Sequence, residues 1–71
     1  MKITCLTIVT GQGVKIYEVN ENKMGAIYEI KQEDVLFQGD AMTHYIGRDK
    51  TGNELLRVHP SVPVVIDYSY Q

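Results

Sequence analysis

The sequence predicts a small, mainly β protein: an antiparallel barrel or roll of five to six short strands. Three observations support this prediction. The first segment is dense in Ile, Val and Thr, glycine-containing turns separate several strand-like segments, and the last segment alternates strictly between apolar and polar residues. A barrel or roll is preferred because closing the sheet hides the strand edges. An α+β arrangement with one helix around residues 22–37 is the alternative.

The chain has 71 residues, so we expect one domain covering residues 1–71. A domain of this size buries only about 60% of the surface of its unfolded chain. Cys5 is the only cysteine, which excludes a disulfide within the chain and a four-cysteine zinc site. Stability must therefore come from a well-packed small core or from self-association, and a homodimer or larger homo-oligomer is one expectation.

Residues 2–10, KITCLTIVT, are the first expected strand, because branched Cβ atoms fit an extended, pleated backbone. Apolar residues occur on both of its faces, which indicates a central strand. The Gly11-Gln12-Gly13 turn follows, and residues 14–19 resume a strand pattern. These two segments are predicted to form a hairpin.

The next segment is ambiguous between strand and helix. Residues 20–25 are polar and end in glycine, which predicts a loop, and residues 26–31 then match a third strand. Apolar side chains also recur at helical spacing between residues 22 and 37, and Asn22 is an acceptable helix cap. Gly25 disfavours that helix, so the strand is preferred.

The segment EDVLFQGD, residues 33–40, resembles the cleavage site of picornaviral cysteine proteases. The match covers Val35 to Gly39 and fails at Glu33 and Asp40. We interpret these residues as part of the fold and not as a processing site. Residues 35–37 are expected in the core, with Phe37 buried, and Gln38-Gly39 are expected to form the turn that follows.

A second hairpin is predicted from residues 41–48 and 53–59. Asp49-Lys50-Thr51-Gly52 joins them, with Asp starting the turn and Gly taking the left-handed position. Pro60 and Pro63 then mark a turn or a sheet edge, because proline cannot donate a ladder hydrogen bond.

The C-terminal segment shows the clearest alternation of period two. Its apolar face consists of Val62, Val64, Ile66, Tyr68 and Tyr70. Such a face must be covered, either by the core or by another copy of the chain, and a terminal strand can also pair across a sheet edge. The expected interface residues are therefore Val64, Ile66, Tyr68 and Tyr70.

No arrangement of residues predicts a catalytic site or a bound cofactor. Cys5 lies in an apolar strand with Lys2 as its only cationic neighbour in sequence, which is typical of a structural cysteine. The segment around Gly11-Gln12-Gly13 lacks the spacing and the following helix of a phosphate-binding loop. Glu33 and Asp34 are adjacent, so their side chains diverge in a strand. We predict that the protein is not an enzyme.

No metal site is predicted either. Asp40 and His44 would share one face of a strand, but about 13 Å apart along it. His59 precedes a proline at a strand end, where we expect it to be solvated. His44, His59 and Cys5 do not match a known ligand spacing.

The charge pattern bears on the class of partner. Seven basic and nine acidic residues are scattered along the chain, giving a net charge of −2, which provides no long-range attraction for nucleic acid. No segment approaches the roughly 20 apolar residues of a membrane span, and no export signal is recognised, so a cytoplasmic location without membrane contact is expected.

By elimination, the sequence favours a non-enzymatic binding or regulatory protein that contacts an unknown protein partner. A phage or mobile-element inhibitor of a host protein is one example of this class. The alternative is a small β barrel that binds single-stranded nucleic acid through exposed aromatic and basic side chains. Its candidate residues are Tyr17, Tyr28, Tyr45, Tyr68, Tyr70, Lys15, Arg48 and Arg57.

Overall fold

The computed structural model describes residues 1–69. Among these residues it contains six strands and no helix, which confirms the mainly β prediction. The strands are β1 (Lys2–Thr10), β2 (Gly13–Glu18), β3 (Glu29–Phe37), β4 (Asp40–Arg48), β5 (Glu54–Val58) and β6 (Val64–Ser69). No helix within residues 1–69 is long and apolar enough to cross a membrane.

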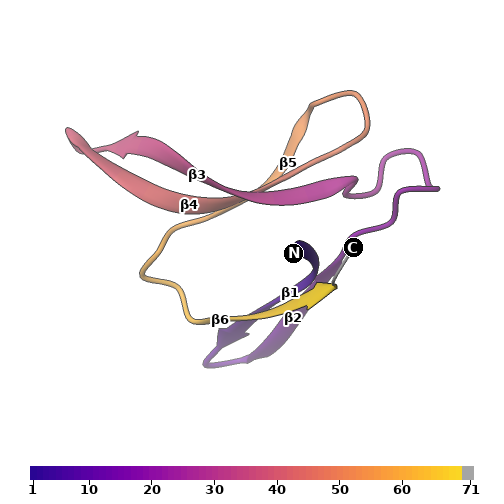
Figure 1. Ribbon diagram of the computed structural model, residues 1–71. Coiled ribbons are helices and arrows are strands. Elements are labelled where there is room, and N and C mark those ends of the chain that lie inside the picture. Colours follow the sequence, from indigo (N-terminus) through magenta and orange to yellow (C-terminus); the bar gives the residue numbers. More distant parts are fainter. Residues whose placement is uncertain (70–71) are drawn as a thin grey trace.

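The strands form two three-stranded antiparallel sheets, β2-β1-β6 and β3-β4-β5, which lie one above the other (Figure 1). Among the described residues the sheets do not close into the expected barrel. The connection from β5 to β6 carries Pro60 and Pro63, which cannot donate ladder hydrogen bonds, and it leads the chain from one sheet to the other.

The first sheet contains the predicted first hairpin. β1 lies in its centre, with Leu6 opposite Tyr17 on β2 and opposite Ile66 on β6. The β1–β6 register shifts between Ile3 and Cys5, which is a bulge. The bulge brings both Ile3 and Leu6 onto the face that meets the second sheet, although three positions separate them.

The second sheet resolves the ambiguous segment. The third strand begins at Glu29, three residues later than expected, and continues to Phe37. The proposed helix at residues 22–37 is wrong, because all nine residues of β3 pair with β4, from Glu29 opposite Arg48 to Phe37 opposite Asp40. Gly25, with φ +80°, lies in the loop before β3 in a backbone conformation that an α-helix does not contain.

The expected burial of Phe37 is wrong. Phe37 is 43% exposed and Leu36 is 77% exposed. Phe37 lies on the face of β3 that points away from the other sheet, whereas Leu36 lies at the end of the β3–β4 hairpin, which extends past that sheet (Figure 1). The expected turn at Gln38-Gly39 is confirmed, and both residues have positive φ, 52° and 89°. Two such residues are typical of a type I′ turn, whose twist matches that of the flanking strands. Residues 33–40, which resemble a protease cleavage site, thus form the end of a hydrogen-bonded hairpin.

The main core lies between the two sheets. It consists of Ile3, Leu6, Ile27, Ile30 and Val58, all buried. Partly buried side chains surround it, among them Val62, Val64 and Ile66 from the C-terminal segment. Much of the alternating apolar face predicted at the C-terminus is therefore covered by the protein's own core.

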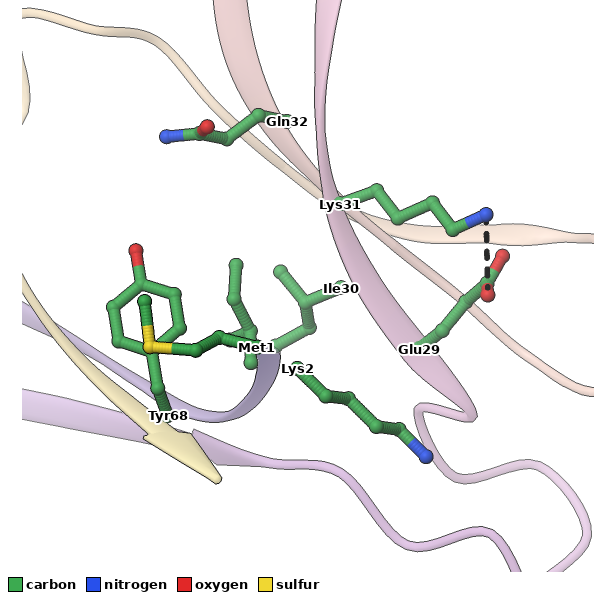
Figure 2. A pocket seen from close by; sticks show the side chains of 8 residues that line it. Met1, Lys2, Glu29, Ile30, Lys31, Gln32 and Tyr68 are labelled. Atoms are coloured by element: carbon green, nitrogen blue, oxygen red, sulfur yellow. Dashed lines mark ion pairs between the residues drawn. The ribbon is translucent and has the colours of Figure 1, made fainter. Parts of the chain in front are cut away.

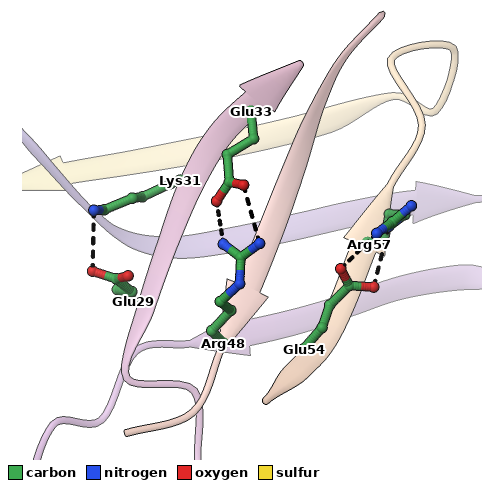
Figure 3. Close-up of polar contacts among 6 residues, drawn as sticks. All are labelled: Glu29, Lys31, Glu33, Arg48, Glu54 and Arg57. Atoms are coloured by element: carbon green, nitrogen blue, oxygen red, sulfur yellow. Dashed lines mark hydrogen bonds and ion pairs between the residues drawn. The ribbon is translucent and has the colours of Figure 1, made fainter. Parts of the chain in front are cut away.

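A further buried side chain, Ile46, lies on the face of the β3-β4-β5 sheet that points away from the other sheet. Ile46 is only 2% exposed, although its cross-strand neighbours on that face are the charged residues Lys31 and Arg57. Figure 3 shows three ion pairs across this face: Glu29–Lys31, Glu33–Arg48 and Glu54–Arg57. Long charged side chains can cover apolar surface with their methylene groups while their charged ends stay in water. We infer that these side chains cover Ile46.

The turn between β4 and β5 is organised by the Asp49 carboxylate. It accepts hydrogen bonds from the Thr51 hydroxyl at 2.8 Å and from the backbone N–H groups of Thr51 and Asn53, each at 2.9 Å. The Thr51 hydroxyl, followed by the Asn53 N–H, holds the pKa of Asp49 below its ordinary value. The predicted second hairpin and its turn are thus confirmed, with a specific stabilising group.

This lowered pKa predicts a contribution to stability at neutral pH that is lost in acid. Because the folded state holds Asp49 with a lower pKa than the unfolded state, the contribution is present above the unfolded pKa and declines as the pH falls through the folded pKa. Denaturant unfolding from pH 7 to pH 2 should show a smaller loss of stability in Asp49→Ala than in the unmodified protein. Equal losses in both proteins would contradict this role for the carboxylate.

Candidate functional site

The expected interface residues belong largely to the interior. Val64 and Ile66 face the other sheet and pack against the core, whereas Tyr68 is 46% exposed at the end of β6. Tyr70 lies outside the described residues. The structure thus places Val64, Ile66 and Tyr68 on one strand, and Tyr68 is the most exposed of these three.

Tyr68 lies at a cavity of about 520 Å³ at one end of the space between the sheets (Figure 2). Ile3 and Ile30 supply apolar lining, and Lys2 and Lys31 also border the cavity, with their ammonium groups directed away from Tyr68 in Figure 2. Each ammonium group is already paired with a carboxylate: Lys2 with Glu21 at 2.6 Å and Lys31 with Glu29 at 3.6 Å. These ion pairs reduce the attraction that the cavity could exert on an anionic ligand.

The histidines form a packing cluster with Phe37. His44 is buried, and its Nδ1 lies 2.9 Å from the carbonyl oxygen of Met42. The ring centroids of His44 and His59 are 5.3 Å apart, and those of Phe37 and His59 are 4.7 Å apart. Among residues 1–69, no group of three His, Cys, Asp or Glu side chains could hold a metal ion.

The hydrogen bonds of His59 assign its tautomer. The Ser61 backbone N–H donates to Nδ1 of His59 at 3.1 Å, so Nδ1 is an acceptor and the neutral ring carries its proton on Nε2. Nε2 is buried and has no hydrogen-bond partner, so the expectation that His59 is solvated is wrong for this atom. Its nearest aromatic neighbours are Phe37 and His44, so this cluster ties the β3–β4 hairpin to the proline-containing connection.

The residues suggested for nucleic-acid binding do not form one surface. Tyr17 is partly buried against the core, while the Tyr45 hydroxyl accepts a hydrogen bond from the Gln32 amide at 2.9 Å. Arg48 forms a two-pronged ion pair with Glu33, and Arg57 forms one with Glu54. These hydrogen bonds raise the pKa of each arginine and lower that of its carboxylate partner. Both arginine charges are thus already matched within the protein.

The outer face of the β2-β1-β6 sheet is the strongest candidate surface. Four branched aliphatic side chains lie on it, each 42% to 60% exposed: Val9, Val14, Ile16 and Val65. The register places Val9 directly opposite Val14, and it places Ile16 and Val65 on either side of Thr7. We call these four residues the outer aliphatic face.

One margin of the outer aliphatic face is acidic. The next row across the three strands is Glu18, Cys5 and Asp67, since Cys5 is opposite each of the two acidic residues. Cys5, which lies between the two acidic residues, is partly buried. The combination is an apolar area bordered by carboxylates, which suits a partner surface with apolar side chains and a neighbouring basic group.

Sequence reasoning missed this surface. β1 and β2 carry apolar residues on both faces, so their pattern does not reveal which face the second sheet will cover. The alternation of Val14 and Ile16 with Lys15 and Tyr17 was the available signal. It indicates two different faces but not which one is exposed.

Comparisons with protein-family models, curated proteins and solved structures give no significant match to this chain.

Proposed function

We propose that this protein is a non-enzymatic binding module that regulates another protein by contacting it through the outer aliphatic face. The supporting observation is the gathering of four exposed aliphatic side chains on three adjacent strands. Scattered exposed apolar residues are normal on a protein surface, but a contiguous apolar area often marks an interaction site. An inhibitor of a larger protein, including one carried by a phage or mobile element, is a specific form of this proposal.

The free energy gained by covering the outer aliphatic face corresponds to a contact of moderate strength. Fully burying a Val or Ile side chain contributes about 1.5 to 3 kcal/mol, so covering four half-exposed side chains contributes about 1 kcal/mol each. Association also costs translational and rotational freedom. Affinity should therefore depend on additional contacts at the margin, where Glu18 and Asp67 can attract a basic group.

The test compares two exposed apolar residues on different sheets. Val65→Lys places a charge within the outer aliphatic face, whereas Leu55→Lys changes a similarly exposed residue on β5. A partner recovered from the native host should bind the unmodified protein and Leu55→Lys, and should bind Val65→Lys at least about tenfold more weakly by calorimetry. Equal binding of both variants would reject this face as the contact surface.

Binding of single-stranded nucleic acid is the alternative function, and a different experiment tests it. It predicts oligonucleotide binding that weakens steeply with salt and on replacement of Lys15, which is exposed on β2. The matched charges of Arg48 and Arg57 make this alternative the weaker one.

A further inference from the structure

The β2 strand is the edge best suited to pair with another strand. It pairs with β1 through six consecutive residue pairs without a register shift. The β1–β6 and β4–β5 pairings both contain shifts, which increase local twist at those edges. The β3 edge is regular, but Glu29, Lys31, Glu33 and Asp34 place charges along it, a common protection of an open edge.

One hydrogen bond establishes which backbone groups of β2 face outward. The Val19 N–H donates to the Thr4 carbonyl of β1 at 3.0 Å. Successive residues of a strand direct their N–H and C=O groups to opposite sides, so the odd-numbered residues of β2 face β1. Val14, Ile16 and Glu18 therefore direct their N–H and C=O groups toward the open edge.

We propose that a second copy of this chain pairs antiparallel with β2, with Ile16 opposite Ile16 of the other copy. In this register Lys15 lies opposite Tyr17 of the second copy, and Val14 lies opposite Glu18. The outward-facing residues then form the hydrogen-bonded pairs, as the direction of their backbone groups requires. Side chains that face each other across the pair also lie on the same side of the sheet.

The other symmetric registers are poorer. Centring the pair on Lys15 or on Glu18 places like charges directly opposite each other, which is destabilising. Centring it on Val14 or Tyr17 leaves much of β2 without a partner residue. Only the Ile16-centred register pairs residues 14–18 completely without opposing like charges.

The resulting dimer has one continuous sheet of six strands, in the order β6-β1-β2-β2-β1-β6. The outer aliphatic faces of the two copies become adjacent, since Val14 and Ile16 lie at the shared edge. This inference does not depend on the proposed function, because the dimer forms through backbone groups at the edge and leaves the outer aliphatic face exposed.

The first experiment separates backbone pairing from side-chain contact. Ile16→Pro removes an outward N–H without removing a hydrogen bond to β1, whereas Ile16→Ala keeps that N–H and loses most of the side chain. Sedimentation velocity across a dilution series should show a monomer–dimer equilibrium for the unmodified protein. Ile16→Pro should raise the dimer dissociation constant at least about tenfold relative to Ile16→Ala. A monomer at every concentration, or equal constants for the two variants, would overturn the proposal.

The second experiment tests the register and does not require the proline variant to fold. Ile16→Lys and Ile16→Glu should each be monomeric alone, because each places like charges opposite each other at the centre of the pair. Mixing the two should restore a heterodimer. No heterodimer in the mixture would exclude the Ile16-centred register. Val65→Lys should leave the dimer intact, so failure of the protein-binding proposal and failure of this one can be distinguished.

Discussion

Leu6→Ala is expected to cost about 2 to 5 kcal/mol of unfolding free energy, the largest effect of a single core truncation in this protein. Leu6 is fully buried at the centre of β1, opposite Tyr17 and Ile66, and it packs between the two sheets. A domain of this length has a total stability of about 4 to 10 kcal/mol. The substitution should therefore remove much of the native population, as measured by chemical denaturation followed by circular dichroism.

The control for this experiment is Val65→Ala, which shortens an exposed aliphatic side chain on the same sheet. It should change stability by no more than about 0.5 kcal/mol. If Leu6→Ala were as mild as Val65→Ala, the packing of the two sheets around Leu6 would be incorrect.

Ile46→Ala should have the second-largest effect, also about 2 to 5 kcal/mol. Ile46 lies outside the main core, yet it is 2% exposed on the face of the β3-β4-β5 sheet where Lys31 and Arg57 are its cross-strand neighbours. The same denaturation measurement on Glu33→Gln provides the comparison, because it weakens an ion pair on that face without removing apolar volume. We expect the smaller loss from Glu33→Gln, since ion pairs at a surface contribute little.

A result in which Glu33→Gln destabilises the protein more than Ile46→Ala would reverse this interpretation. It would mean that the charged groups themselves, and not the apolar surface they cover, hold this face together. The comparison therefore distinguishes a buried apolar contact from an electrostatic one at the same place in the fold.

The local features were the easiest to predict. The turn between β4 and β5 could be recognised because Asp is suited to start such a turn and Gly to take its left-handed position. In the structure the Asp49 carboxylate accepts hydrogen bonds from backbone N–H groups of this turn. Gln38-Gly39 was likewise recognised as a turn. Such features depend on a few consecutive residues, which is why they can be read directly from the sequence.

The candidate surface could not be predicted in the same way. Val14 and Ile16 look in sequence like residues of a buried face, and Val64 and Ile66 look equally suited to an interface. In the structure the second sheet faces Val64 and Ile66, whereas Val14 and Ile16 are exposed. Which of two apolar faces is covered depends on residues far along the chain.

The sequence by itself determined that this protein is mainly β, with two tight hairpins and an alternating final strand, because strand preference and turn chemistry act over a few residues. Only the tertiary structure decided that residues 29–37 form a strand, that Phe37 is exposed while Ile46 is buried, and that two sheets stack without closing into a barrel. These outcomes depend on pairing and packing between distant segments. The outer aliphatic face and the open β2 edge follow from that packing.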